Sequence, residues 1–481
     1  MKKILLMFGV ASVLNASAQT PCENGFAFVY PCENVDLMSV LDRQDMGGGA
    51  NMNDIWGWTD PDTGVEYALV GRSNGTSFVD ISDPLNPLYV GNLPSAIAGD
   101  NLWRDVKVYG HYAVIVSEHG DHGMQIFDLN KLADVDSYPA EFEADAHYTG
   151  FGHAHNVAVN EESGYAYGVG TSSFGGGLHI VDINDPLNPV LAGGYQESGY
   201  THDAQIVNYK GPDEDYSGAE IAFAFNDDVV AIVDVTDKAD CQLITHASYD
   251  FVSYIHQGWL TEDQRYLLVD DEIDELTFNQ NLRTHMFDVQ DLDNPVYLGY
   301  FDHGISSSDH NQYIKGNYSF QSDYSSGFRI LDISDVSEGS LSLAGYFDIF
   351  PDYDQAGFDG TWSNYPYFES LNVVVSTYDA LFVLRPIDAI MVGTEELTAS
   401  AVEVSVSPNP AADVLTLHLA NATGGKINIQ IVDMSGRAVR EYVQLPLLGN
   451  SINLNVADLP SGSYLIKVGD QEQQTVRMIK Q

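Results

Sequence analysis

The sequence has few cysteines and few basic residues. Its 481 residues include 3 Cys, and 20 Lys and Arg stand against 69 Asp and Glu, which gives a formal net charge of −49. A surface this acidic repels phosphate backbones and anionic lipids, so we expect no nucleic-acid partner and no acidic membrane partner. Cations, basic proteins and neutral sugars remain open as partners. We expect solvation and salt tolerance to be the main reason for the charge.

Long apolar runs are also scarce. After residue 18 no segment offers about 18 uninterrupted apolar residues, so we expect no transmembrane segment. One apolar stretch, residues 4–14, follows Lys2 and Lys3 and precedes the small residues at 16–18. This is the pattern of a signal peptide spanning residues 1–18 and cleaved after Ala18. The mature chain is therefore expected to be exported through the inner membrane.

The few cysteines fit an exported chain. Cys22 and Cys32 lie close together in "PCENGFAFVYPC", directly after the predicted cleavage site. An oxidising compartment favours their pairing into a disulfide that closes a small hairpin. Cys241 is left over, and we expect it to be a small buried apolar residue, because no basic neighbour or helix N-terminus is evident to lower its pKa.

What the sequence has in abundance is one repeated string, an apolar run that ends in Asp. "SFVDISDPLNPLYVGNL" at 77–93 is one copy. Short β-branched and aromatic runs separated by Gly, Pro, Asn and Asp, with a period of roughly 50 residues, are typical of four-stranded propeller blades. The repeated aspartates are Asp80, Asp128, Asp182, Asp234, Asp288 and Asp332.

A second recurrent position lies upstream of these strings and carries His in four consecutive copies. Its register extends backward to Arg104 and approximately to Trp56, and forward to Trp362, which gives seven units. We therefore predict an all-β chain with a β-propeller of seven blades, with six or eight as alternatives. The four histidines are His155, His202, His256 and His310.

The two ends of the repeat region complement each other. The last unit lacks an outer strand, and the chain begins with an orphan strand, "NVDLMSVLD" at 34–42. Pairing of the two would close the ring without leaving exposed sheet edges. We therefore expect the N-terminal strand to complete the last blade.

The repeats, over about residues 21–387, resemble LVIVD-repeat surface proteins and, more closely, the choice-of-anchor B family. The resemblance rests on segments such as "CENGFAFVYPCENVDL" at 22–37, "GHAHNVAVNEESGYAYGVG" at 152–170, "YIHQGWLTEDQRYLLVDDEIDE" at 254–275, "DHNQYI" at 309–314 and "FDGTWSNYPYF" at 358–368. It implies a secreted domain that is attached to different surface anchors in different bacteria. It implies no established biochemical activity.

The composition changes after residue 387. We expect a propeller over 19–387, a polar linker over 388–403 and a small β-sandwich over 404–481, where apolar strands alternate with Asn, Gly and Pro turns. "VSPNPAADVLTLHL", "INIQIVDMSGRAVRE", "LPSGSYLIKV" and "VRMIKQ" resemble the type A C-terminal sorting domain of the type IX secretion system of Bacteroidota. The resemblance implies that this machinery is a partner and that the protein crosses the outer membrane to the cell surface or the medium.

Chemistry is expected on the axial face of the propeller, where the recurrent histidines lie. Imidazoles that converge on one axis, with carboxylates behind them, are the residue types of a transition-metal or general acid/base site. The candidate binding-face residues are Arg104, His153, His155, Asn156, His202, Asp203, His256, Gln257, His310 and Asn311, ringed by Glu118, Asp227, Asp270, Asp271, Glu272 and Asp323. The candidate metal ligands are His155, His202, His256, His310, Asp270 and Glu272. Calcium in an acidic loop is a further candidate cofactor.

A structural alternative and a local pair of histidines also bear on this site. A structural role is open, because a His that begins an inner strand can bond to the neighbouring blade. His153 and His155 are expected to share one side of a strand and to form the strongest local pair.

Two functions from different classes remain. No complete set of nucleophile, base and oxyanion donors is evident, so we favour a surface binding or adhesion module with a protein or glycan ligand. The alternative is a metal-dependent hydrolase or lyase. Convergence of His256, His310 and a carboxylate such as Asp270 or Glu272 would favour that alternative.

Overall fold

The computed structural model describes residues 19–387 and 390, and in the C-terminal part residues 404–412, 414–419, 425–433, 437–447, 451–457, 459–468 and 474–480. The predicted signal peptide and nearly all of the predicted linker lie outside these residues. The chain divides into two compact units, residues 1–393 and 394–481.

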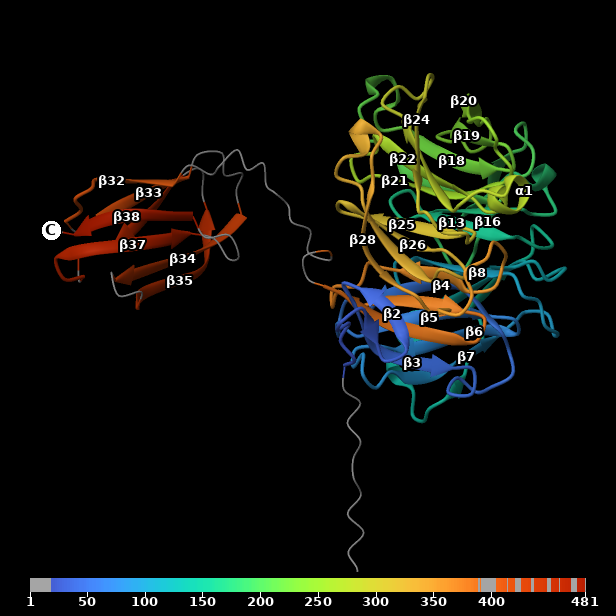
Figure 1. Cartoon of the computed structure of the whole chain (residues 1–481), viewed down its shortest axis with the longest axis horizontal. Coiled ribbons are helices and arrows are strands. Elements are labelled where there is room, and N and C mark those ends of the chain that lie inside the picture. The colour runs from blue at the N-terminus through green and yellow to red at the C-terminus, as the bar shows by residue number, and fades with distance from the viewer. Residues whose placement is uncertain are drawn as a thin grey trace, which may run out of the picture. The chain divides into compact units, whose positions relative to one another are not determined.

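Residues 19–387 form seven β-sheets, each built on four strands (Figure 1). The first sheet contains β4 (Met52–Thr59), β5 (Glu66–Arg72), β6 (Gly75–Asp80) and β7 (Leu88–Pro94), extended by the parallel β11 (Ala140–Glu141). The second contains β8 (Arg104–Tyr109), β9 (Tyr112–Ser117), β10 (Met124–Asp128) and β12 (Ala146–Tyr148). The third contains β13 (Asn156–Asn160), β14 (Tyr165–Val169), β15 (Leu178–Asp182) and β16 (Val190–Tyr195).

The remaining four sheets repeat the same antiparallel order. They contain β17 (Asp203–Asn208), β18 (Glu220–Asn226), β19 (Val229–Asp234) and β20 (Gln242–Ala247); then β21 (Ile255–Leu260), β22 (Tyr266–Asp271), β23 (Arg283–Asp288) and β24 (Val296–Asp302). The sixth has β25 (Asn311–Lys315), β26 (Tyr318–Ser322), β27 (Phe328–Asp332) and β28 (Ser342–Phe347), extended by β2 (Tyr30–Glu33) and β1 (Phe26–Ala27). The seventh has β29 (Thr361–Tyr365), β30 (Val373–Thr377), β31 (Ala380–Pro386) and β3 (Val35–Asp42).

The sheets are arranged as the blades of a ring. The innermost strand of each sheet contacts the innermost strand of the next, in the cyclic order β4, β8, β13, β17, β21, β25, β29 and back to β4. A short helix, α1 (Asp274–Phe278), interrupts the connection between β22 and β23. The predicted all-β propeller is therefore confirmed.

The N-terminal strand completes the seventh blade as predicted. β3 pairs antiparallel with β31 from Val35 opposite Pro386 to Asp42 opposite Ala380. The predicted disulfide joins Cys22 and Cys32, and Cys32 in β2 lies opposite Phe347 of β28. The first residues of the described chain are thus tied to both the sixth and the seventh blade.

The repeated aspartates have a structural role that explains their recurrence. In all six copies a carboxylate oxygen accepts the backbone N–H of the residue two positions later, at 2.9 Å in five copies and 3.0 Å at Asp128. Such turns satisfy backbone donors where the third strand of a blade ends. The strings therefore mark the turn between the third and the outer strand.

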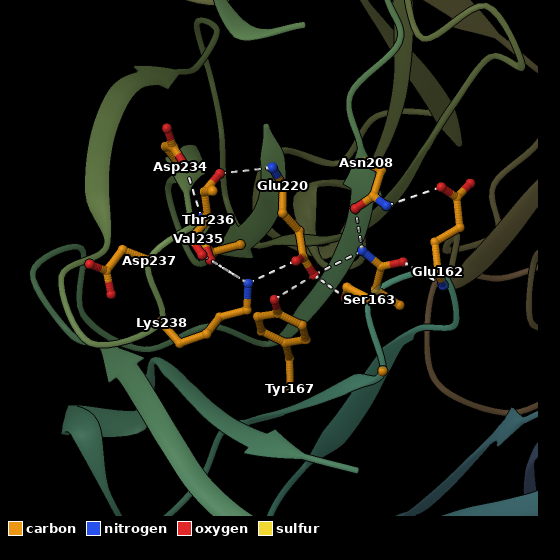
Figure 2. Close-up of polar contacts among 12 residues, drawn as sticks. Glu162, Ser163, Tyr167, Asn208, Glu220, Asp234, Val235, Thr236, Asp237 and Lys238 are labelled. Carbon is orange, nitrogen blue, oxygen red and sulfur yellow. Dashed lines mark hydrogen bonds and ion pairs between the residues drawn. The ribbon is translucent and has the colours of Figure 1, made fainter. Parts of the chain in front are cut away.

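Apolar and polar contacts both join neighbouring blades. Phe223 and Phe225 of the fourth blade pack in one buried cluster with Leu267 and Val269 of the fifth. Glu220 of β18 is the acceptor of a buried polar network between the third and fourth blades (Figure 2). Its Oε1 accepts hydrogen bonds from Asn160 Nδ2 at 2.8 Å, Ser163 Oγ at 2.7 Å and Tyr167 Oη at 2.7 Å. Its Oε2 accepts one from Lys238 Nζ at 2.8 Å.

The second unit is a small β-sandwich. One sheet has β32 (Val404–Ser407), β33 (Val414–Leu419) and β36 (Ser451–Asn455), and the other has β34 (Gly425–Asp433), β35 (Ala438–Leu447), β37 (Gly462–Val468) and β38 (Gln474–Lys480). Leu415 and Leu417 of the first sheet share a buried core with Ile431 and Ile466 of the second. This arrangement is the predicted sandwich.

Candidate functional site

The innermost strands surround a cavity of about 340 Å³ on the axial face. Predicted carboxylates Glu118 and Glu272 line it, together with Asp54. So do seven of the predicted binding-face residues: Arg104, His155, Asn156, His202, His256, His310 and Asn311. The register of the repeats therefore brings most of the candidate residues to one place.

The four recurrent histidines form a continuous row of contacting rings around this cavity. Their ring centroids are 4.2 Å apart between His155 and His202, 4.1 Å between His202 and His256, and 4.4 Å between His256 and His310. Each comes from the equivalent position of the third, fourth, fifth or sixth blade. Adjacent blades, and not opposite ones, therefore supply the imidazoles.

Hydrogen bonds fix the orientation of three of these rings. His202 Nδ1 lies 3.0 Å from the backbone carbonyl oxygen of His256, and His310 Nδ1 bonds to that of Trp362. A carbonyl oxygen only accepts, so Nδ1 of both rings carries the hydrogen and Nε2 keeps its lone pair. His155 Nδ1 lies 2.7 Å from Glu118 Oε1, and this hydrogen bond lowers the pKa of Glu118. These contacts join blades and also leave Nε2 free to act as a ligand.

His256, Glu272 and His310 form the one group with His ligands in the described residues whose ligand atoms all lie within 4.8 Å of one another. His310 Nε2 is 3.9 Å from Glu272 Oε1, which accepts a hydrogen bond from Tyr324 Oη at 2.6 Å. His256 Nδ1 is buried without a hydrogen-bond partner, 3.7 Å from Asp270 Oδ1. Two imidazoles and one carboxylate are a ligand set that catalytic zinc uses.

Burial keeps these imidazoles neutral. It lowers the pKa of His256 to about 3, with the nearby His155 adding to the effect, and it lowers the pKa of His310 to about 3, with His256 adding to it. Burial also lowers the pKa of His202 well below the ordinary value. A neutral imidazole is the form that binds a metal ion, so no proton has to be removed at neutral pH.

The structure places other candidates elsewhere. Asp203 and Gln257 line a separate cavity of about 150 Å³ with Trp56 and Lys107. Asn156 and Asn311, which also follow recurrent histidines, line the axial cavity, so the surroundings of this position differ from blade to blade. Asp54, and not Trp56, reaches the axial cavity from the first blade. The register was expected to reach Trp56 only approximately, and the residue of this strand that lines the cavity lies two positions earlier.

Several predicted carboxylates support the site from behind or lie outside it. Asp270 accepts hydrogen bonds from the Gln257 backbone N–H at 2.8 Å and from Gln312 Nε2 at 3.1 Å, so it is held beneath His256. Asp227, Asp271 and Asp323 do not line the axial cavity.

The expected pairing of His153 with His155 on one side of a strand was wrong. β13 begins at Asn156, so both residues precede it, and His153 does not line the cavity. Cys241 is half-buried, and burial raises the pKa of its thiol to about 11, as expected for an unreactive cysteine.

Sequence reasoning missed the aromatic rim of the cavity. Tyr200, Tyr254, Tyr324, Trp103 and Phe358 line it. Two of them had a detectable signal, because Tyr200 and Tyr254 each stand two residues before a recurrent histidine. The other three come from connections that share no repeat pattern.

Two protein families match parts of the chain. The LVIVD repeat matches residues 66–94, 151–197 and 312–348, and the secretion system C-terminal sorting domain matches residues 405–481. The chain carries LVIVD repeats and a C-terminal sorting domain. The sorting domain indicates export through the type IX secretion system to the cell surface or the extracellular space, with the secretion machinery as a partner. The choice-of-anchor B resemblance agrees with these matches and stays a prediction.

In the described part of this LVIVD-repeat chain, no helix has the length and apolar character needed to cross a membrane. None of the curated proteins matches the chain.

Solved structures resemble the chain at low identity. PorZ, an essential bacterial surface component of the type-IX secretion system of Porphyromonas gingivalis, is 12% identical with a TM-score of 0.46, over 89% of this chain and 59% of that one. The extracellular domain of a putative hybrid two-component system from B. thetaiotaomicron is 11% identical with a TM-score of 0.45, over 92% and 58%. A chain of the mitotic checkpoint complex is 12% identical with a TM-score of 0.49, over 81% and 100%.

The LVIVD-repeat chain thus spans under two thirds of PorZ and of the B. thetaiotaomicron domain. All three TM-scores are below 0.5, and no property of this chain is inferred from them.

Proposed function

We propose that the mature chain, beginning at residue 19, is a surface binding protein whose axial cavity binds a small polar ligand at a transition-metal ion. His256, Glu272 and His310 are the proposed metal ligands. The observation that carries the proposal is the convergence of these three side chains, from two neighbouring blades, at the wall of an open cavity. Residues 1–18 are the proposed signal peptide, 388–403 the proposed linker and 404–481 the proposed sorting domain.

With only three protein ligands, such an ion could also bind a small ligand from solution. Three protein ligands leave a fourth position of a tetrahedral ion open, which is typical of sites that bind substrate or water. The cavity offers about 340 Å³ beside that position. Its tyrosines and Asn156 and Asn311 provide hydrogen-bonding groups around an oxygen-rich ligand.

Hydrogen bonds made by the proposed ligand side chains support the same function. Tyr324 donates to Glu272, and the Trp362 carbonyl oxygen accepts from His310. Such outer partners fix the direction in which a ligand side chain presents its donor atom. Glu272 and His310, two of the three proposed ligands, are therefore held in place before an ion arrives.

Metal content is the direct test. The full exported chain, prepared without chelators or a His tag, should contain about one equivalent of a transition metal by mass spectrometry of the elements. His256→Ala and His310→Ala should each reduce this content at least roughly tenfold. His111→Ala is the matched control, because His111 is exposed on the second blade and does not line the cavity. Full metal content in both His256→Ala and His310→Ala, or calcium alone, would refute the proposal.

Binding at the open position can be measured separately. Cobalt replaces zinc in such sites and reports its coordination through visible absorption, so titration with azide should change the spectrum of the cobalt-loaded protein. An unchanged spectrum would mean that the ion has no exchangeable position and only a structural role.

A metal-dependent hydrolase is the second candidate. It is favoured by the His155 and Glu118 pair, which lines the same cavity with its 2.7 Å hydrogen bond and could receive a proton from a bound water. Metal-dependent hydrolysis of nitrophenyl esters that falls in His155→Gln, with metal content unchanged, would support it. Equal rates in both proteins would leave the binding role alone.

A further inference from the structure

The connection between β22 and β23 buries acidic side chains behind the axial cavity. Glu272, at the start of this connection, lines the axial cavity, and the next turn forms α1. Asp274 and Glu275 in α1 are 1% and 3% exposed, and Asp309, next to His310, is 4% exposed. Three carboxylates are thus removed from water within one small region.

Four of the six oxygens of these carboxylates lack partners, whereas Asp274 Oδ2 accepts a hydrogen bond from Gln280 Nε2 and Asp309 Oδ2 accepts one from the Asp271 backbone N–H at 3.2 Å. Asp274 Oδ1, both carboxylate oxygens of Glu275, and Asp309 Oδ1 are buried without a hydrogen-bond partner. Across residues 19–387 no lysine or arginine lies within ion-pair distance of any of them, and His285 Nε2 stays 3.8 Å from Asp274 Oδ2. Carboxylates that are buried in this way are strongly destabilising unless a cation or a proton neutralises them.

The neighbouring groups show how closely the charges interact. Burial, followed by the charge of Asp274, raises the pKa of Glu275 to about 10, and Ser308 also lies against Glu275. Asp274 and Glu275 therefore lie close enough for their charges to interact.

We propose that Asp274 and Glu275 bind a calcium ion, with Asp309 adding negative charge to the site. Asp274, Glu275 and Ser308 offer oxygen ligands, which suit a hard cation. The nitrogens of His285 and Gln280 face Asp274 Oδ2 and leave its Oδ1 without a partner. Calcium takes six to eight oxygen ligands, including hydroxyl, backbone carbonyl and water oxygens. The two carboxylates and Ser308 would supply some of these ligands, and water and backbone oxygens would supply the rest. Asp274 also lines a cavity of about 750 Å³, which gives an ion a route to the site.

The consequence concerns the position of Glu272. An ion bound to Asp274 and Glu275 would fix the conformation of α1 and of the residues just before it, including Glu272 at the axial cavity. The calcium site thus goes beyond the proposed axial function, and it would stabilise the chain whether or not a transition metal binds there.

Thermal unfolding of the full chain in calcium and in the chelator EGTA tests the inference. At millimolar calcium we expect the midpoint to rise by roughly 2–4 °C, as for an extracellular site of submillimolar affinity. Glu275→Gln removes one ligand charge and keeps the shape, so its midpoint should not respond to calcium. Without calcium, Glu275→Gln should be at least as stable as the wild type, because the neutral amide needs neither a cation nor a proton to neutralise it.

The control uses the other acidic group of the chain. Asp213, Asp291 and Asp293 also bring carboxylate oxygens within 4.8 Å of one another, but Asp291 and Asp293 are exposed. Asp291→Asn should keep the full calcium response. A response that persists in Glu275→Gln and disappears in Asp291→Asn would move the site to that surface group and overturn the inference.

The remaining outcomes are also decisive. A wild type that becomes more stable at low pH and ignores calcium would show that protons, and not an ion, neutralise the cluster. The calcium response of His256→Ala separates this inference from the axial proposal, since that variant should lose the transition metal and keep its response to calcium. A Glu275→Gln protein that keeps the transition metal and loses the calcium response would give the complementary result.

Discussion

Replacing Glu220 with Ala is expected to be one of the most destabilising single changes in the propeller. Glu220 accepts hydrogen bonds from Asn160, Ser163, Tyr167 and Lys238 (Figure 2). The Lys238 side chain is 10% exposed, so the truncation would leave a buried charge without its carboxylate. Removing one partner of a buried ion pair costs about 3–5 kcal/mol, and a hydrogen bond to a charged group contributes about 1.5–3 kcal/mol.

These contributions overlap and do not add. Lys238 Nζ keeps bonds to two backbone carbonyl oxygens, at 2.7 and 3.3 Å, so part of its charge stays compensated. We therefore expect Glu220→Ala to lower the free energy of unfolding by about 4 kcal/mol. Glu220→Gln keeps an oxygen for Asn160, Ser163 and Tyr167 but loses the ion pair, so we expect about half that loss.

Equilibrium unfolding in urea, followed by tryptophan fluorescence and circular dichroism, measures both values. The control is Glu162→Gln at the neighbouring pair of Glu162 and Lys210, whose side chains are 58% and 66% exposed. An exposed ion pair of this kind should contribute nothing measurable. If Glu220→Ala were no less stable than Glu162→Gln, the polar contacts between the third and fourth blades would not stabilise the ring.

Two further predictions concern pH and the disulfide. Burial, opposed by Lys107 and reinforced by Asp105, raises the pKa of Asp203 to about 8. Between about pH 4 and pH 8 the folded state therefore holds this proton, whereas the unfolded chain loses it. The contribution of Asp203 to the free energy of unfolding thus falls as the pH rises through that window. Asp203→Asn should thus become steadily more stable relative to the wild type from pH 4 to pH 8 and level off above; parallel pH profiles of urea unfolding would contradict this. Replacing both Cys22 and Cys32 with Ser should reduce stability by about 2–3 kcal/mol and speed proteolysis within 22–33. Unchanged cleavage rates would mean that the pairing of β2 with β28 holds the hairpin by itself.

Much of the fold could be predicted because it is periodic. The recurrent aspartates end the third strand of six of the seven blades, so their spacing predicts where the blades lie. The missing outer strand of the last unit and the orphan strand at 34–42 together predicted the pairing of β3 with β31. What could not be predicted is non-periodic: β11 pairs with β7 of another blade, and β1 and β2 extend the sixth sheet.

Only those residues of the candidate site that recur in the repeats could be predicted from the sequence. Register alone located His155, His202, His256 and His310 at equivalent positions, and the structure brings them into one row. The convergence of Glu272 with His256 and His310 depends on the connection that contains α1, which has no counterpart in the repeat strings. Asp203 and Gln257 line a different cavity, although Asn156 and Asn311, which also follow recurrent histidines, line the axial one, and the repeat register does not distinguish the two cases.

The pairing of β3 with β31 also constrains the order in which the chain can be finished. β3 lies at residues 35–42, but its partner is Ala380–Pro386, so β3 has no place in the ring until the seventh unit has been made. The sorting domain at 405–481 follows in sequence. Any chain long enough to carry the sorting domain is therefore long enough to have closed its ring, whereas a chain that ends before residue 380 lacks both the sorting domain and the closure. Because the sorting domain follows the last strand of the ring, only chains that contain the whole propeller can carry the export signal.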